Sequence, residues 1–356
     1  MQAIKFKSLK SETLFFDDLK KEISNYFSTN NLEPTANFEM IFKVSFWIVS
    51  WMVTWSAIII FKNDFWLAFS IGILHMFTHL MIAFNVTHDA NHFAISKNKT
   101  VNTVFGYFIE LLGCNKKLWM LGHNQDHHSF VNIHEHDNNI DGYKLLRLCP
   151  QEKLLKHHKY QWLYAPFIYG LATLNYATFR DLKMMVKYVA NSKFKITAVF
   201  LLEFFLFKVL YYSYLFLIPI FVFGVDFKLI LSFFLLGHFI NGMFLALVFL
   251  IPHLTEDTSY PLPIEGTVNK NWAVHVINTT GDFATESKYM EWFVGGINLH
   301  VAHHLFPKVC HVHYKKLSPI IKLVSHKHGY VYREVPTFMG GLKSHFRLLK
   351  TLGKAA

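Results

Sequence analysis

Residues 41–92 read IFKVSFWIVSWMVTWSAIIIF, then KND, then FWLAFSIGILHMFTHLMIAFNV and THDANH, so two long apolar runs lead to a pair of histidines. At about 1.5 Å per residue, Ile41–Phe61 and Phe65–Val86 are each long enough to cross a hydrocarbon core of roughly 30 Å. The turn Lys62-Asn63-Asp64 joins them. This stretch predicts a helical hairpin in a membrane that delivers the chain directly to His88 and His92.

Two further apolar runs, Ala198–Phe223 and Phe227–Ile251, are joined by the turn Gly224-Val225-Asp226. The 356 residues are 52% hydrophobic and only 17% charged, whereas about a quarter of the residues are charged in ordinary soluble domains. A fifth apolar stretch, Val101–Gly113, is too short to span and is interpreted as an interfacial or re-entrant helix. We expect an all-α integral membrane protein with four transmembrane helices.

The distribution of the basic residues predicts which side of the membrane each segment faces. Lys62 and Lys228 are the lysines near the two tight turns, whereas the N-terminus, the middle segment and the C-terminal part are rich in lysine and arginine. By the positive-inside rule, these three parts and both termini face the cytoplasm, where they form a helical cap. The net charge of +11 forms no basic stripe, so it predicts attraction to anionic lipid headgroups and no nucleic-acid partner.

Residues 1–40 form a polar segment in front of the predicted membrane domain, residues 41–356. Within it Phe16, Leu19, Ile23 and Phe27 recur at helical spacing. The pattern predicts an amphipathic helix that lies on the membrane surface. Packing against the protein's own cytosolic part is an equally good interpretation.

Three histidine blocks carry the chemistry: His88-Asp89-Ala90-Asn91-His92, His123-Asn124-Gln125-Asp126-His127-His128 and Asn298-Leu299-His300-Val301-Ala302-His303-His304. Histidines three or four residues apart stack on one face of a helix. The adjacent histidines that end the last two blocks point about 100° apart, so a single ion on a regular helix does not collect both. Eight imidazoles also exceed the four ligands of a tetrahedral ion. The blocks therefore predict two metal ions.

Ligand type alone leaves the metal open, because imidazole suits zinc, copper and iron. The three cysteines are widely spaced and odd in number, so no thiolate site or disulfide framework is indicated. His253, just past the fourth apolar run, is a hypothetical ninth ligand. His75 and His79 lie inside the second run, where hydrogen bonding within the bundle is at least as good an interpretation, and they are left out of the ligand set.

The blocks, together with the order of the four runs, resemble the integral-membrane fatty acid desaturases. The segments HNQDHHSFVNIHEHDNNID, HKYQWLYAPFIYG and GGINLHVAHHLFPKVCHVHY are similar to bacterial acyl desaturases related to linoleoyl-CoA and front-end desaturases. The resemblance covers roughly residues 40 to 335. One histidine pair would be unspecific, but this combination is highly specific.

The resemblance implies two iron ions, O2 activation and removal of two hydrogens from adjacent methylenes of an acyl chain, which leaves a cis double bond. The implied iron ligands are His88, His92, His123, His127, His128, His300, His303 and His304, with His253 at an additional position. Asp89, Asp126, Asp137 and Asp141 are candidates for orienting the imidazoles, although exposed carboxylates are the more ordinary interpretation.

The expected partners follow from the same resemblance. The substrate is a fatty acyl chain carried by CoA, a carrier protein or a phospholipid in a membrane that we expect to be the bacterial inner membrane. Residues 1–40 are too short for a fused cytochrome b5, so electrons are expected from a separate donor such as ferredoxin or cytochrome b5. Trp119, Gln161, Trp162 and Tyr164 are candidates for the substrate's polar end, with interfacial anchoring the alternative for the aromatics.

Two alternatives stay open at this point. A membrane di-iron hydroxylase of a lipid, alkane or carotenoid has a similar histidine framework. A histidine-rich metal transporter or sensor would place metal-binding residues inside the spans, whereas these blocks lie beyond the apolar runs. In addition, His300 stands where front-end desaturases usually have glutamine, which leaves the position of the new double bond open.

Overall fold

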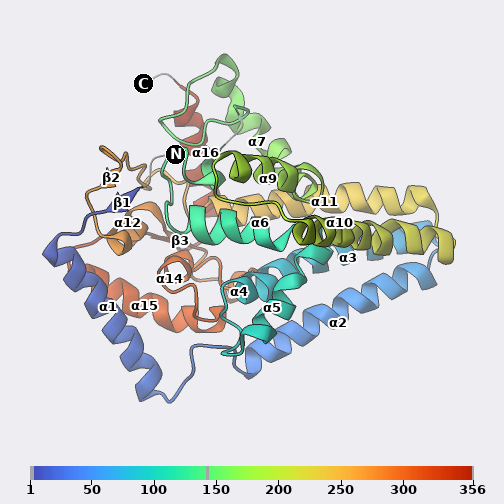
Figure 1. The fold of residues 1–356 in the computed structure, drawn as a ribbon, viewed down its shortest axis with the longest axis horizontal. Helices are drawn as coiled ribbons and strands as arrows, with labels where there is room; N and C mark the ends of the chain where they lie inside the picture. Colours follow the sequence, from blue (N-terminus) through green and yellow to red (C-terminus); the bar gives the residue numbers. More distant parts are fainter. Residues whose placement is uncertain (1–3, 142–143, 355–356) are drawn as a thin grey trace. The chain divides into compact units, whose positions relative to one another are not determined.

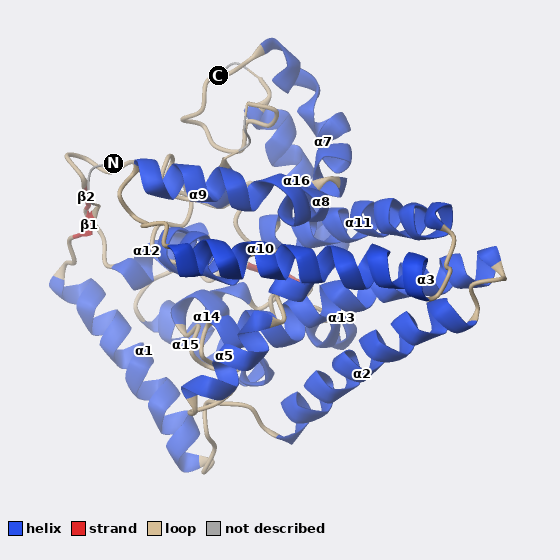
Figure 2. Cartoon of the chain, turned by 45° about the vertical axis from the view of Figure 1, so that its right-hand side comes forward, coloured by secondary structure: helices blue, strands red, loops and turns tan. Residues whose placement is uncertain are grey.

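The computed structural model describes residues 4–141 and 144–354, which are mostly helical (Figures 1 and 2). The described part of the chain divides into two compact units. Unit 1 comprises residues 1–37, 121–166 and 247–356, and unit 2 comprises residues 38–120 and 167–246. Two of the four boundaries fall inside helices, α7 (Gln161–Gly170) and α11 (Phe227–Leu250).

Unit 2 contains the apolar helices. Its elements are α2 (Phe38–Ile60), α3 (Phe65–Ile82), a π-helical turn (Ala83–Thr87), α4 (His88–Asn91), α5 (Lys99–Tyr107), a 3-10 turn (Glu110–Leu112), α6 (Lys116–Met120), α8 (Ala172–Asn175), a π-helical turn (Tyr176–Arg180), α9 (Asp181–Ala190), α10 (Ala198–Tyr212), a π-helical segment (Ser213–Val222) and most of α11. Four helical segments are long and apolar enough to cross a membrane: Phe38–Ile60, Phe65–Asn91, Ala198–Val222 and Phe227–Leu250. The four predicted spans are thus confirmed.

Two of the four spans are central to unit 2. In their most apolar parts, 56% of the residues of Phe65–Asn91 and 50% of those of Phe227–Leu250 are buried, against 28% for Phe38–Ile60 and 17% for Ala198–Val222. Glycine permits the close approach of the central pair: a Cβ on Gly237 would lie 2.5 Å from Met76 Cβ, and one on Gly72 would lie 2.3 Å from the Phe233 ring. Small residues at helix interfaces serve this purpose in membranes, where close packing drives association.

The π-helical segment Ser213–Val222 contains Pro219, which has no N–H to donate to the backbone carbonyl five residues earlier. That carbonyl belongs to Tyr214, and the Trp55 indole N–H donates to it at 2.9 Å. A backbone acceptor is therefore satisfied inside the bundle, where water is absent.

The stretch predicted to lie at the interface forms short elements that cannot span. Helix α5 is followed by the 3-10 turn Glu110–Leu112. Glu110 is buried there, and its Oε1 accepts hydrogen bonds from Asn115 Nδ2 (2.9 Å) and the Lys116 backbone N–H (2.7 Å). Burial, only partly offset by the bond from Lys116, raises the pKa of Glu110 from 4.5 to about 8.

We predict that Glu110→Gln flattens the pH dependence of thermal stability. Because the folded-state pKa is raised, the stabilisation from this carboxyl is present below about pH 4.5 and is lost as the pH rises towards about 8. Glutamine keeps an acceptor oxygen but does not titrate. Melting temperatures of the detergent-solubilised protein between pH 5 and 9 test this, with the exposed Glu39→Gln as control. Equal slopes for Glu110→Gln and wild type would contradict the prediction.

Unit 1 contains β1 (Lys5–Phe6), α1 (Lys10–Thr29), a π-helical turn (Leu121–His127), 3-10 turns (Asn138–Ile140, Lys156–Tyr160 and His311–His313), the first part of α7, β2 (Thr267–Val268), α12 (Trp272–Thr279), β3 (Asp282–Phe283), α13 (Lys288–Phe293), α14 (His300–Leu305), α15 (Tyr314–Lys327), β4 (Glu334–Val335) and α16 (Phe338–Leu352). The strands are two residues long and pair in parallel, with Lys5 opposite Thr267 and Asp282 opposite Glu334. The cytosolic location expected for this part of the chain stays a prediction, as does the predicted division of the chain at residue 40.

Helix α1 lies along α15 (Figure 1). Its Phe15, Leu19 and Ile23 are buried in one core with Leu317 and Ile321 of α15. Of the two interpretations of this amphipathic helix, packing against the protein's own unit accounts for its apolar face. That face is therefore not available to a membrane surface.

Candidate metal centre

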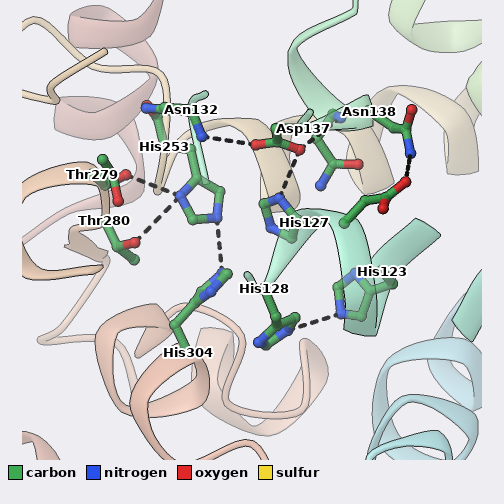
Figure 3. Close-up of polar contacts among 12 residues, drawn as sticks. His123, His127, His128, Asn132, Asp137, Asn138, His253, Thr279, Thr280 and His304 are labelled. Atoms are coloured by element: carbon green, nitrogen blue, oxygen red, sulfur yellow. Dashed lines mark hydrogen bonds and ion pairs between the residues drawn. The ribbon is translucent and has the colours of Figure 1, made fainter. Parts of the chain in front are cut away.

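The second and third histidine blocks meet inside unit 1, although about 170 residues and two predicted crossings separate them along the chain. One nitrogen each of His127, His253, His300 and His304 lie within 4.8 Å of one another, and the same holds for His128, His303 and His304. All of these side chains are buried. Figure 3 shows the second block facing His253 and His304. The structure thus brings blocks two and three together in unit 1.

For three of these imidazoles, hydrogen bonds determine which ring nitrogen carries the proton and which keeps its lone pair. Nδ1 of His127 faces Asp137 Oδ1 at 3.0 Å, Nδ1 of His253 faces the Thr279 carbonyl at 3.1 Å, and Nδ1 of His300 faces the Ile297 carbonyl at 2.8 Å. A carboxylate and two carbonyls only accept, so each Nδ1 carries the proton and donates. Each Nε2 is left with a lone pair, which is the arrangement that partners of metal-ligating histidines impose.

The donor set fits a metal ion. His304 Nε2 lies 3.1 Å from His253 Nε2, and two nitrogens bound to one metal at about 2.1 Å each are roughly 3 Å apart. The Nε2 of His127 is buried and has no hydrogen-bond partner among the described residues. A buried acceptor without a partner is costly, and a bound cation would remove that cost.

Electrostatics keeps the cluster in its ligating form. Burial, and then the neighbouring His127, lower the pKa of His253 to about 3, and burial with the surrounding imidazoles lowers that of His304. Burial alone would raise the pKa of Asp137. The His127 imidazole and the N–H groups of Asn139 and Asn132 hold it below its usual value instead. His253 and His304 are therefore neutral and the Asp137 carboxylate is charged at neutral pH.

The π-helical turn Leu121–His127 changes how the second block pairs. The His128 N–H donates to the His123 carbonyl five residues earlier, and the two Nε2 atoms lie 3.3 Å apart. Regular α-helical spacing would favour His123 with His127, whose ring centroids are 5.5 Å apart, against 4.8 Å for His123 and His128. His127 and His128 fall in different nitrogen groups, whereas the adjacent His303 and His304 fall in one group with His128. The expectation that one ion does not collect adjacent histidines therefore agrees with the second block and not with the third.

The first block lies in unit 2. His88 at the start of α4 and His92 just after its end lie edge to face, with ring centroids 4.8 Å apart and both side chains buried. Asp89 Oδ1 is 3.7 Å from His88 Nδ1. The indole of Trp119 lies 6.0 Å and 6.1 Å from the two imidazoles.

His79 has a hydrogen-bond partner at each ring nitrogen, whereas His75 has one at Nδ1 and its buried Nε2 has none among the described residues. His75 Nδ1 lies 3.0 Å from Thr54 Oγ1. His79 Nδ1 faces the His75 carbonyl at 2.8 Å, and its Nε2 is hydrogen-bonded to the Tyr214 hydroxyl. Leaving both out of the ligand set agrees with these contacts.

The other candidate residues lie in different places. Asp126 accepts from Asn138 Nδ2 at 2.9 Å, and Asp141 is exposed. Gln161 is buried and donates to the Arg147 and Leu349 carbonyls, and the Tyr164 hydroxyl donates to the Leu145 carbonyl. Lys350 Nζ lies 4.9 Å above the Trp162 ring. These contacts are structural, and a substrate role for Gln161, Trp162 and Tyr164 stays a prediction.

Sequence patterns gave no signal for several partners of the ligands. Asn132 donates its side-chain amide to the His253 carbonyl and its backbone N–H to Asp137 Oδ2 (Figure 3). The Tyr314 hydroxyl lies 3.3 Å from His303 Nδ1. Asp282 Oδ1 accepts a hydrogen bond from the Val301 N–H at 2.9 Å and so fixes the position of the start of α14. These residues come together through folding and share no motif.

Unit 2 also contains a pocket of about 80 Å3. Its apolar lining includes Met76, Leu80, Ile109, Leu112 and Leu245. Trp119 also lines it, and its indole lies 6.0 Å and 6.1 Å from the His88 and His92 imidazoles, which are not among the lining residues. Thr173, Tyr211, His238 and Asn241 also line it. The pocket gives room to a short apolar segment of a ligand next to the first histidine pair.

The four apolar helices and the buried, oriented imidazoles define a class: a helical membrane protein with a site that could hold metal ions. The family model described as Fatty acid desaturase matches residues 64–336, which is more than half of the chain. The chain belongs to the fatty acid desaturase family, an enzyme family that introduces double bonds into fatty acyl chains.

Curated relatives match along nearly the whole chain. The sn-1 linoleoyl-lipid 6-desaturase of Synechocystis is 30% identical over 352 residues, covering 95% of both chains. The acyl-lipid (8-3)-desaturase of Physcomitrium patens is 28% identical over 347 residues, covering 95% of this chain and 72% of the relative. The acyl-lipid (8-3)-desaturase of Mortierella alpina is 26% identical and covers 96% and 78%.

Proposed function

We propose that this desaturase uses two iron ions held by His88, His92, His123, His127, His128, His253, His300, His303 and His304. The observation that carries the proposal is the set of three Nδ1–H groups held by Asp137, Thr279 and Ile297, which leaves three Nε2 lone pairs in one nitrogen cluster. When bound, the iron supplies the oxygen chemistry. The assignment of His88 and His92 rests on the family resemblance and on their edge-to-face contact.

The chain's own residues have three tasks in the reaction. The histidines and Asp137 maintain the ligand geometry, and burial of the cluster excludes water. The pocket beside Trp119 holds methylenes of the acyl chain against the first histidine pair. Two hydrogens leave adjacent carbons as two electrons and two protons. Together with two electrons from a donor and two further protons, they reduce O2, the oxidant, to two waters.

We propose that the substrate is an acyl chain on a membrane lipid. The names of the Synechocystis and Physcomitrium relatives specify acyl-lipid substrates, and that of the Synechocystis protein specifies a linoleoyl chain. By this likeness the substrate already carries double bonds, and the new one is made on the carboxyl side of them.

We propose the electron donor and the orientation of the protein in the membrane from the distribution of charge. The net charge of +11 would suit a separate acidic carrier such as ferredoxin or cytochrome b5. The scarcity of basic residues at the two tight turns supports a cytoplasmic site and cytoplasmic termini, in a bacterial inner membrane.

Product analysis tests the function. We predict that a host lacking the activity, expressing this chain and fed linoleate, accumulates lipids that have lost two further hydrogens. Mass spectrometry of the phospholipid and acyl-CoA pools after a short pulse should show the product first in the phospholipid pool. Gain of one oxygen instead would establish the hydroxylase, and product appearing first in acyl-CoA would contradict the lipid-linked substrate.

A further inference from the structure

The pocket of unit 2 has polar side chains on part of its lining, among them Tyr211, His238 and Thr173. We infer that the wall formed by Tyr211, His238 and Thr173 recognises a carbon–carbon double bond already present in the acyl chain and thereby selects unsaturated substrates. The inference rests on the proposed desaturase function and names the residues that set its substrate preference.

The wall is a closed hydrogen-bond network. Thr173 Oγ1 donates to the His238 carbonyl at 2.7 Å, so it can only accept from His238 Nδ1 at 3.1 Å. The His238 proton is then on Nδ1, and Nε2 accepts from the Tyr211 hydroxyl at 3.1 Å. The imidazole is therefore neutral, and its orientation is held at both nitrogens.

This network lies in the middle of the helical bundle, where burying polar side chains for a purely structural role would cost free energy. His238 stands near the middle of the 24-residue helix α11, and Tyr211 and His238 are buried. Polar side chains at this depth are rare and usually mark function. Phenylalanine, leucine and valine would fill the same volumes without polar atoms to satisfy. Neighbouring pocket residues such as Met76, Leu80 and Leu245 are of that apolar kind.

A saturated chain gains nothing from such a wall, because methylenes have neither an acceptor nor a polarised C–H. The O–H and N–H groups of the wall are all donated within the network, so a double bond can bond to it through its vinyl C–H groups, which are weak donors. The Tyr211 oxygen, which gives its proton to His238, keeps lone pairs that can receive such C–H groups. The wall therefore complements an unsaturated segment.

The position of the wall in the pocket also determines which part of a bound acyl chain would lie against it. Trp119 lines it beside His88 and His92 at the end of the second span, whereas Met76 and His238 line it from the middle of theirs. An acyl chain whose reacting carbons lie near the first histidine pair would have its methyl-side carbons near the wall. An existing double bond on the methyl side of the new one would lie there.

The test compares Tyr211→Phe and Thr173→Val with wild type in membranes supplied with stearoyl, oleoyl and linoleoyl lipids in competition. Both changes keep the side-chain volume and remove a hydroxyl. The matched control is Tyr212→Phe, whose hydroxyl donates to the Ala177 carbonyl and does not line the pocket. We expect the linoleoyl-to-stearoyl product ratio to fall about three- to fivefold in each wall variant, the effect of one weak contact, and to be unchanged in the control.

A second measurement does not depend on turnover. Stabilisation of the purified protein by each lipid, read as a melting-temperature shift, should favour linoleoyl over stearoyl lipid in wild type and lose that preference in the wall variants. Equal shifts for all lipids in wild type, or an unchanged preference in the variants that fold, would overturn the inference. A preference in binding without any loss of hydrogen would instead contradict the proposed desaturase activity.

Discussion

His304→Ala is expected to abolish desaturation and to lower the bound iron from the proposed two ions to about one per chain. His304 belongs to both nitrogen groups of unit 1, and its Nε2 lies 3.1 Å from that of His253. Because residues that only orient a ligand cost about 10- to 100-fold when changed, loss of a ligand should cost at least about 100-fold in activity. Metal analysis of the purified protein and product analysis measure the two effects.

The matched control is His326→Ala, an exposed histidine of α15 outside both groups. It should retain full metal and activity. His253→Ala, measured alongside, tests the ninth ligand and should resemble His304→Ala. Full metal content and activity in His253→Ala would remove His253 from the ligand set, and the same result in His304→Ala would refute the metal assignment itself.

Asp137→Asn should lower metal affinity and activity by about 10- to 100-fold. The Asp137 carboxylate accepts from His127 Nδ1 and from the backbone N–H groups of Asn132 and Asn139. An asparagine amide must turn its NH2 towards one of these donors. Where it faces His127, the imidazole proton moves to Nε2 and the metal-binding lone pair is lost.

The comparison is Asp141→Asn, which makes the same change at an exposed carboxylate of the same segment. Metal retention against a chelator, measured on folded protein, separates a metal effect from loss of structure. If Asp137→Asn and Asp141→Asn retained metal equally well, orientation of His127 by Asp137 would be disproved.

Local patterns were sufficient for several features because each depends on residues close together in the chain. Apolar length predicted the four spans to within a few residues, except that the second helix continues to Asn91 and so carries His88. Four-residue spacing predicted the contact of His88 and His92. The amphipathic pattern found α1 but could not choose between a membrane and α15 as its partner, because both present an apolar surface.

Other features were beyond local patterns. The π-helical turn that pairs His123 with His128 could not be predicted, because such a turn has no hydrophobic periodicity of its own in the sequence. In the sequence, only the position of His253 after the fourth apolar run suggested it as a ligand. The structure shows its contacts with Thr279 and His304. The polar wall joins Thr173, Tyr211 and His238 from three helices, and no single segment contains the pattern.

The sequence by itself determined the four spans and the three histidine blocks, since span length and ligand spacing are properties of contiguous residues, and the resemblance of these segments indicated a desaturase. Only the tertiary structure decided which imidazole nitrogens converge, which oxygens hold their protons, and which side chains line the pocket. Those properties depend on atoms brought within about 3 Å from distant parts of the chain, and no local pattern records such distances.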